Sequence, residues 1–202
     1  YKGQAPKATI VSQFFSDIVT NAEAYITDYR MVLTNNSYHS ALAGCNGNGK
    51  YDVMSNFADN QLYNNSSLLH VFASGNDGNF TCSPYPLGYA TVKSGWQVAK
   101  NVLTVGAINA QSRPYAAPGF SSRGPAADGR LKPEVVSHGV NVFSDYPNNE
   151  YGSGSGTSMA APGVTGTLTL LYEHYRKLHG GADPKSSLIK AIACNTAEDL
   201  GN

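Results

Sequence analysis

The stretch YGSGSGTSMAAPGVTGT, residues 151–167, decides how the rest of the chain is interpreted. Its first half consists of small residues, and after Pro162 apolar side chains recur every three to four positions, at Val164, Leu168, Leu171, Tyr172 and Tyr175. That spacing predicts a helix. Proline is acceptable near a helix start, because the N–H groups of the first turn have no partner within the helix. We therefore expect Ser158 just ahead of a helix or in its first turn.

A serine in this place has two interpretations. Serine is among the best helix caps, so position alone favours a capping role for Ser158. The free N–H groups and the positive dipole end of a helix N-terminus also favour negative charge that develops beside a nucleophile. The sequence around Ser158 decides between the two, as described below.

The composition indicates one globular domain, residues 1–202. Hydrophobic residues make up 41% of the chain and charged residues 14%, and the formal net charge is zero. No basic surplus points to nucleic acid or to an anionic membrane, and no apolar run has the length of a membrane span. We expect neither nucleic acid nor a membrane as a partner. The low charge and the many Asn, Ser, Gly and Tyr residues suit a secreted protein.

The three cysteines predict one disulfide and one free thiol. Cys45 and Cys82 lie in loops rich in Gly, Asn and Pro, so we expect them to pair. Cys194 has apolar neighbours at helical spacing, which predicts a buried small side chain. No cysteine pair has the spacing of metal ligands.

Strand and helix patterns alternate along the chain. The expected strands are residues 8–15, 31–34, 68–73, 101–107 and 141–144, and the expected helices are residues 16–29, with Ser16 as cap, 55–64 and the segment after Pro162. This alternation predicts βαβ units and a mainly parallel sheet with helices on both faces. Ligands bind beyond the carboxyl ends of such strands. Residues 36–39 and 74–76 lie at strand ends, so we expect them to converge with Ser158.

The segment Gly156-Thr157-Ser158-Met159-Ala160-Ala161-Pro162 resembles the nucleophile motif of the subtilisin-like serine proteases. Other stretches resemble further segments of that family in the family's order, namely residues 2–10, 72–78, 119–125, 131–136 and 195–201. The resemblance therefore covers nearly the whole chain. The surroundings of Cys45 and Cys82 look most like secreted members from Bacteroidetes-type bacteria.

The resemblance implies a three-layer α/β fold and peptide hydrolysis by a Ser–His–Asp triad through an acyl-enzyme. Ser158 would be the nucleophile, and the side-chain amide of Asn76 would hold the oxyanion together with the N–H group of Ser158. By itself Asn76 could equally be a turn asparagine. The implied substrate pocket has walls made of Ser37, Tyr38 and His39 on one side and Ala73, Ser74 and Gly75 on the other.

The family's catalytic aspartate and histidine motifs lie upstream of the segment that resembles residues 2–10. None of the five histidines has the family's His-Gly-Thr-His surroundings. We expect His70 in the core, His138 in an exposed turn, His39 at the pocket wall, and His174 and His179 at the end of the last helix pattern. The chain by itself is therefore expected to be inactive.

The resemblance thus implies the C-terminal portion of one catalytic domain, with an α/β fold that is incomplete at both ends. We expect the missing N-terminal part as a partner, as a separate chain or cut away, besides a polypeptide substrate. In the family fold a further strand lies between residues 8–15 and 31–34. We expect its place to be an open slot, and direct pairing of those two strands would contradict this.

Other functions are weighed against the endopeptidase. A non-catalytic, subtilase-like binding or scaffold protein would lack the aspartate and histidine motifs upstream, whereas a protease would have them. An α/β-hydrolase esterase needs a Gly-x-Ser-x-Gly elbow, which Thr157-Ser158-Met159 is not. No ligand cluster supports metal catalysis, and no cofactor is required. The family often binds structural calcium, for which Asp77, Asp128 and Asp145 are loop carboxylates.

Overall fold

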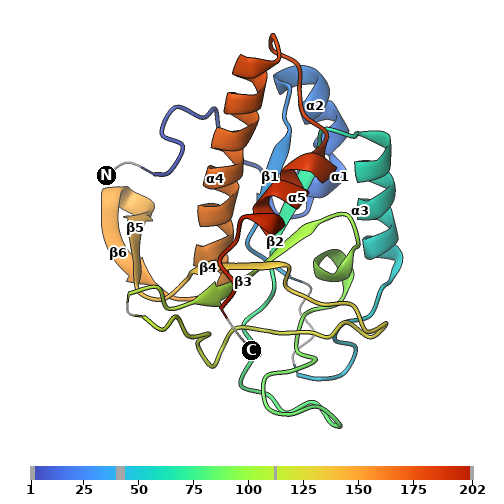
Figure 1. Ribbon diagram of the computed structural model, residues 1–202, viewed down its shortest axis with the longest axis vertical. Helices are drawn as coiled ribbons and strands as arrows, with labels where there is room; N and C mark the ends of the chain where they lie inside the picture. Colours follow the sequence, from blue (N-terminus) through green and yellow to red (C-terminus); the bar gives the residue numbers. More distant parts are fainter. Residues whose placement is uncertain (1–2, 40–43, 112, 201–202) are drawn as a thin grey trace.

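The computed structural model describes residues 3–39, 44–111 and 113–200, and its centre is a parallel sheet of four strands (Figure 1). The strands follow one another in chain order across the sheet: β1 (Leu33–Asn36), β2 (Leu69–Ala73), β3 (Leu103–Ile108) and β4 (Val135–His138). In the register, Asn36 lies opposite Phe72 and Ala73 lies opposite Val105. The carboxyl ends of β1 and β2 therefore lie side by side.

Helices cover both faces of this sheet, which makes three layers. On one face lie α4 (Thr157–Leu178) and α5 (Ser186–Asn195), and on the other lie α1 (Asp17–Thr20), α2 (Ala22–Tyr29) and α3 (Val53–Asn64). Two short 3-10 turns complete the helical elements, η1 (Gly95–Val98) and η2 (Pro147–Asn149). The predicted three-layer α/β fold is confirmed.

Strand β2 shows why the sheet needs both helical layers. Leu69 and Val71 pack against α4 and α5, whereas Phe72, on the other side of the strand, packs in the cluster formed with α1, α2 and α3. All five residues of β2 are buried. A strand in the middle of a parallel sheet is apolar on both faces for this reason.

Helix α3 was predicted correctly and begins two residues earlier than expected. Asp52 caps it, because its carboxylate accepts hydrogen bonds from the N–H groups of Met54 and Ser55, while the Ser55 hydroxyl accepts one from the N–H group of Asp52. The helix expected over residues 16–29 divides at Asn21 into α1 and α2. Ser16 makes no capping bond, so that part of the prediction is wrong.

The strand expected over residues 8–15 is wrong. These residues form no strand, and Ile10 and Phe14 expose 85% and 81% of their surface. Among the described residues, β1 is an edge strand whose outer side has no partner strand. Apolar and β-branched residues favour a strand only where the segment pairs with a neighbouring strand, and residues 8–15 do not pair with β1. The direct pairing that would have contradicted the expected slot is not found.

Strand β4 was not predicted, and it overturns the interpretation of His138. His138 lies at the end of β4, half-buried, and not in an exposed turn. The strand expected over residues 141–144 is β5 (Val142–Tyr146), which pairs antiparallel with β6 (Glu150–Gly154) in a separate hairpin. The small residues ahead of Ser158 are thus the return strand of this hairpin.

The cysteines divide as expected into one pair and one free thiol. Cys45 and Cys82 form a disulfide between two loops. Cys194, however, is exposed, and its predicted burial is wrong. Ile189 is the buried residue of α5, and a residue five positions further along a helix points away from that face.

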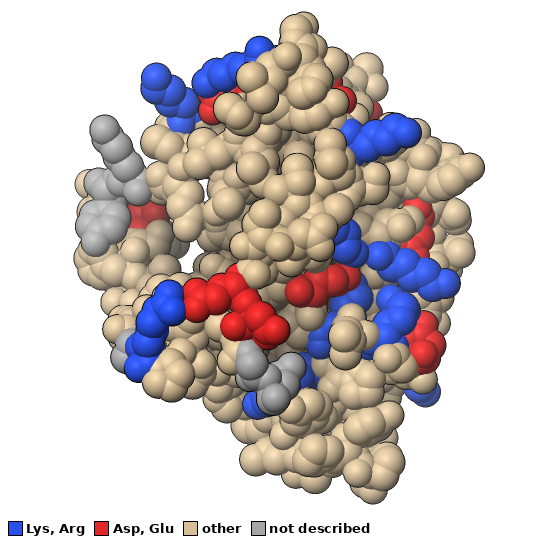
Figure 2. All heavy atoms as spheres, in the orientation of Figure 1, with Lys and Arg blue, Asp and Glu red and all other residues tan. Residues whose placement is uncertain are grey.

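Charge is mixed over the surface. Figure 2 shows that, on the face drawn, Lys and Arg side chains lie next to Asp and Glu side chains, with wide uncharged areas between them. The described helices include none that is long and apolar enough to cross a membrane.

Candidate active site

Ser158 is the second residue of α4, so it lies in the first turn as predicted, and the helix cap is Gly156. The hairpin β5–β6 leads directly into this turn (Figure 1). Gly156 has a φ of +156°, and its N–H group donates to the carbonyl of Gly139, 2.8 Å away. Residues other than glycine rarely adopt this φ, so glycine permits the backbone conformation that leads into the first turn beside Asn76.

Two reciprocal hydrogen bonds join Ser158 to Ser37, the residue that follows β1. The Ser158 hydroxyl donates to the carbonyl of Ser37 at 3.2 Å, and the Ser37 hydroxyl donates to the carbonyl of Ser158 at 3.0 Å. In a regular helix the Ser158 carbonyl would accept the N–H group of residue 162. Pro162 lies inside α4 and has no N–H group, so Ser37 supplies the donor that the helix lacks.

Asn76 follows β2 and is tied to the residue directly before Ser158. Its side-chain oxygen accepts hydrogen bonds from the Thr157 N–H group at 2.9 Å and from the Thr157 hydroxyl at 3.1 Å. The N–H group can only donate, so the oxygen of the amide must face Thr157. The NH2 group of the exposed Asn76 side chain therefore remains as a donor beside the start of α4.

The three places expected to converge are thus brought together. Both candidate walls meet the start of α4: Ser37 contacts Ser158, and the N–H group of Gly75 donates to the Thr157 hydroxyl at 3.3 Å. Ala73, Ser74 and Gly75 are all buried, so this second wall exposes little of its surface.

The first wall contains Tyr38 and the exposed His39. The Tyr38 ring stacks on Phe15, at 5.1 Å between centroids, and its hydroxyl donates to the side-chain oxygen of Asn36. Burial raises the pKa of Tyr38 to about 12, so its hydroxyl stays protonated at neutral pH.

The histidines have other contacts. His70 is buried between Thr34 and Gln61, as predicted for a core residue, and burial lowers its pKa to about 3. The Nδ1 atom of His138 accepts the N–H group of Ala110. The Ser158 hydroxyl donates to a main-chain carbonyl and not to an imidazole.

The sequence interpretation missed two residues of this site. Thr157 was part of the decisive stretch but was assigned no role, although both of its donors hold Asn76. Gln97, in η1, donates to the carbonyl of Tyr38 at 2.7 Å, and no sequence pattern marked it.

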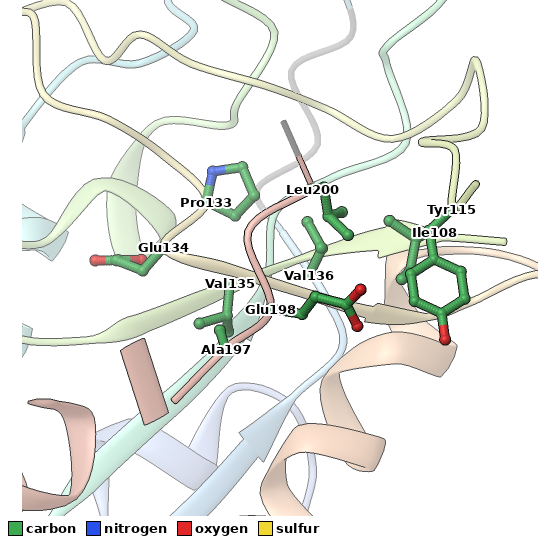
Figure 3. Close-up of a pocket in the computed structure, with 9 residues that line it drawn as sticks. All are labelled: Ile108, Tyr115, Pro133, Glu134, Val135, Val136, Ala197, Glu198 and Leu200. Carbon is green, nitrogen blue, oxygen red and sulfur yellow. The ribbon is translucent and has the colours of Figure 1, made fainter. Parts of the chain in front are cut away.

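A separate pocket of about 250 Å³ lies beside β4 (Figure 3). Its lining residues are Ile108, Tyr115, Pro133, Glu134, Val135, Val136, Ala197, Glu198 and Leu200. Neither Ser158 nor Asn76 contributes to it. Its two carboxylates have cationic partners, Lys132 and Lys190 for Glu134 and Arg113 for Glu198. We therefore do not place the active site there.

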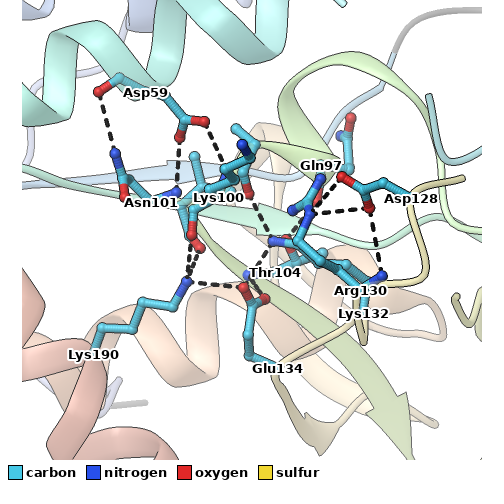
Figure 4. Close-up of polar contacts among 12 residues, drawn as sticks. Asp59, Gln97, Lys100, Asn101, Thr104, Asp128, Arg130, Lys132, Glu134 and Lys190 are labelled. Carbon is cyan, nitrogen blue, oxygen red and sulfur yellow. Dashed lines mark hydrogen bonds and ion pairs between the residues drawn. The ribbon is translucent and has the colours of Figure 1, made fainter. Parts of the chain in front are cut away.

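Glu134 belongs to a buried polar network that joins β3, β4 and α5 (Figure 4). Lys132 donates to the carbonyl of Ala99, to the Thr104 hydroxyl and to Glu134, each at 2.8–3.0 Å. Burial lowers the pKa of Lys132 to about 8, against the opposing effect of the Glu134 carboxylate. Burial would raise the pKa of Glu134, but the two lysines outweigh it and lower that pKa.

The candidate calcium ligands are engaged elsewhere. Asp77 pairs with Lys93 and Asp128 pairs with Arg130. Asp145 lies in β5 and accepts the Ser144 hydroxyl. The described residues contain no group of three or more His, Cys, Asp or Glu side chains that could hold a metal ion. The calcium site stays a prediction.

This architecture defines a class: an α/β protein with a serine in the first turn of a helix at the carboxyl ends of parallel strands. The family model "Subtilase family" matches residues 1–202, and the chain belongs to that family. It is a family of proteases. Over 83 residues the chain is 41% identical to a C5a peptidase of Streptococcus pyogenes, which covers 40% of this chain and 7% of that protein.

A PII-type proteinase of Lactococcus lactis subsp. cremoris is 33% identical over 94 residues, 41% of this chain and 5% of that protein. The chain thus spans only a small part of these relatives. Two solved structures share its fold. Sphericase has a TM-score of 0.66 at 22% identity, with 92% of this chain and 56% of that chain covered. The prenylagaramide maturation protease PagA has a TM-score of 0.62 at 21% identity, with 95% and 60% covered.

Proposed function

We propose that residues 1–202 are the C-terminal portion of one subtilisin-like catalytic domain and supply the nucleophile and oxyanion hole of a serine endopeptidase. The observation that carries this proposal is the pair of hydrogen bonds from Thr157 to the Asn76 side-chain oxygen. They leave the amide NH2 group to donate next to Ser158. Preorganised donors of this kind stabilise the charge that develops on a carbonyl oxygen.

In the proposed reaction, the Ser158 oxygen forms a bond to the carbonyl carbon of the cleaved peptide, and its proton passes to a general base. The C–N bond then breaks, and the amine leaves with that proton. Water hydrolyses the resulting ester. The residues at the two walls, Ser37 to His39 and Ala73 to Gly75, would hold the polypeptide substrate on either side of Ser158.

The general base and its carboxylate come, in this proposal, from polypeptide outside these 202 residues. His70 is buried and its ring is engaged by Thr34 and Gln61, and the Nδ1 atom of His138 is engaged by the N–H group of Ala110. The partner would be the N-terminal part of the same catalytic domain. We also propose an extracellular location, supported by the Cys45–Cys82 disulfide, since disulfides persist in oxidising compartments.

Labelling with a fluorophosphonate tests the proposal. The longer polypeptide that contains this chain, with its upstream sequence, should be labelled at Ser158 as mapped by mass spectrometry. Ser158→Ala should abolish labelling. Ser155→Ala, at the nearby exposed serine, should leave it unchanged.

Two outcomes would contradict the proposal in different ways. If the longer polypeptide is not labelled, the chain belongs to a non-catalytic binding or scaffold protein. If the 202-residue chain labels by itself, the general base lies within it and the proposed partner is wrong.

A further inference from the structure

The segment of residues 119–125 has no part in the site described so far. It contacts the loop that carries Asn76. Ser122 contacts this loop directly, and it is fully buried. The N–H group of Gly78 also donates to the carbonyl of Phe120 at 2.8 Å. The Asn76 loop therefore rests on this segment.

Ser122 makes three hydrogen bonds to the loop, all at 3.0 Å. The Ser74 hydroxyl donates to the carbonyl of Ser122, and the N–H group of Ser122 donates to the carbonyl of Gly75. The third bond runs from the N–H group of Asp77 to the Ser122 hydroxyl oxygen. Only this third bond uses the side chain.

These bonds hold Asn76 from both sides, because they fix the residue before it and the residue after it. The Asn76 side chain is exposed, so its own packing does little to hold it. The backbone of Gly75 also lies close to the Ser122 side chain. A Cβ atom on Gly75, whose φ is +115°, would lie 3.0 Å from the Ser122 hydroxyl. The position of the amide thus depends on Thr157 at one end and on Ser122 at the other.

We propose that Ser122 is a positioning residue of the oxyanion hole, whose hydroxyl holds the Asp77 N–H group and thereby keeps the Asn76 amide in place. This inference rests on the proposed function. Without the hydroxyl, the Asp77 N–H group loses its acceptor and the loop can shift. A displaced donor stabilises the developing charge less, so turnover falls while substrate binding at the walls is kept.

The chain offers a matched control in Ser121. It is buried to a similar degree, but its hydroxyl accepts the N–H group of Ala107 in β3 and makes no bond to the Asn76 loop. Ser121→Ala therefore removes the same group from the same segment at a site that does not act through Asn76.

The test is a double-mutant cycle in the full-length protease with a chromogenic peptide substrate. Asn76→Ala should lower kcat about 10²- to 10³-fold. Ser122→Ala should lower kcat about tenfold with KM nearly unchanged, the effect of losing one hydrogen bond's worth of transition-state stabilisation. In the Asn76→Ala background it should have no further effect. Ser121→Ala should leave kcat within about twofold in either background.

If Ser122→Ala fails to fold, Ser122→Cys is the second variant, because a thiol is a weaker acceptor of similar shape. Its kcat should lie below that of the wild type. The inference is overturned if Asn76→Ala lowers kcat but Ser122 variants do not, or if the two effects multiply. A normal kcat for Asn76→Ala would instead overturn the oxyanion role of Asn76, and this inference with it.

Discussion

The carbonyl of Ser158 shows how one residue links helix geometry to the candidate site. Pro162 removes the donor that this carbonyl would have within α4, and the Ser37 hydroxyl replaces it from the end of β1. The proline was expected at a position where its missing N–H group would cost nothing. It lies instead where Ser37, a residue of the candidate pocket wall, replaces the missing donor.

Ser37→Ala should therefore destabilise the chain. The half-buried Ser158 carbonyl would lose its partner, at a cost of about 1–2 kcal/mol in the free energy of unfolding. Urea denaturation followed by circular dichroism measures this. In a Pro162→Ala background the helix supplies its own N–H group, so the effect of Ser37→Ala should shrink. An equal effect in both backgrounds would show that the bond to Ser158 is not what Ser37 contributes.

His70 predicts a dependence of stability on pH. Gln61 offers only an acceptor to Nε2, so Nε2 carries the proton and Nδ1 accepts the Thr34 hydroxyl. Burial lowers the pKa of His70 to about 3 from 6.5. Between these values the unfolded chain binds the proton and the folded chain does not. The stabilisation is therefore complete above pH 6.5 and is lost as the pH falls.

The expected slope from His70 is up to about 1.4 kcal/mol per pH unit below its unfolded pKa. Urea denaturation of wild type and His70→Gln at several pH values measures it, since the variant should lose this part of the slope. The exposed His174 provides the control, and His174→Gln should keep the wild-type slope. Parallel curves for wild type and His70→Gln would contradict the prediction.

At the scale of elements, the sequence predicted those whose residues carry their own signal. Strand β2 is buried on both faces and apolar apart from His70, and α4 has apolar side chains at helical spacing, so both were placed nearly correctly. Residues 8–15 and β4 were misjudged for one reason. Whether an extended segment becomes a strand depends on a neighbour to pair with, and local sequence does not contain that neighbour.

Ion pairs also connect elements of the fold, and the prediction at this scale concerns the buried carboxylate of Glu134. It pairs with Lys132 and Lys190 and thereby connects the segment just before β4 to α5. Glu134→Gln leaves the buried Lys132 ammonium without its counter-charge, which should cost about 3 kcal/mol in the free energy of unfolding. The exposed pair of Glu173 and Lys177 is the control, because an ion pair in solvent contributes little and Glu173→Gln should leave stability nearly unchanged.

The effect of Glu134→Gln should also depend on pH. The pKa of Lys132 is lowered to about 8 from 10.5, so between these values the unfolded chain binds more protons and stability rises with pH. The cost of removing Glu134 comes from the charged form of Lys132. It should therefore be greatest at low pH, shrink as the pH rises towards about 8, where the folded wild type loses this proton, and stay level above that pH. A cost that does not shrink between neutral pH and pH 8 would contradict this.

At the scale of the molecule, the sequence named the residues of the candidate site but not the residues that hold them in place. Ser158 and Asn76 were named from a resemblance, and their convergence follows from the rule that strand ends share one edge of a parallel sheet. Thr157 and Ser122 contact the Asn76 loop through hydrogen bonds that span 81 and 45 positions of the chain. No periodicity or composition records such pairings, so only the folded structure reveals them.

The open side of β1 gives the last prediction. An edge strand with free N–H and carbonyl groups, next to exposed apolar side chains, favours pairing with another chain. Ile10 and Phe14, in the segment that precedes α1, are exposed apolar side chains, and the isolated 202-residue chain should therefore self-associate, as light scattering would show. Ile10→Ser combined with Phe14→Ser should reduce this association, whereas Leu178→Ser, at an apolar residue 67% exposed at the end of α4, should not. If all three proteins are equally monomeric, the edge is already protected within the chain. If instead the association is confirmed and the longer polypeptide is monomeric, upstream sequence covers the same edge that brings Ser37 to Ser158.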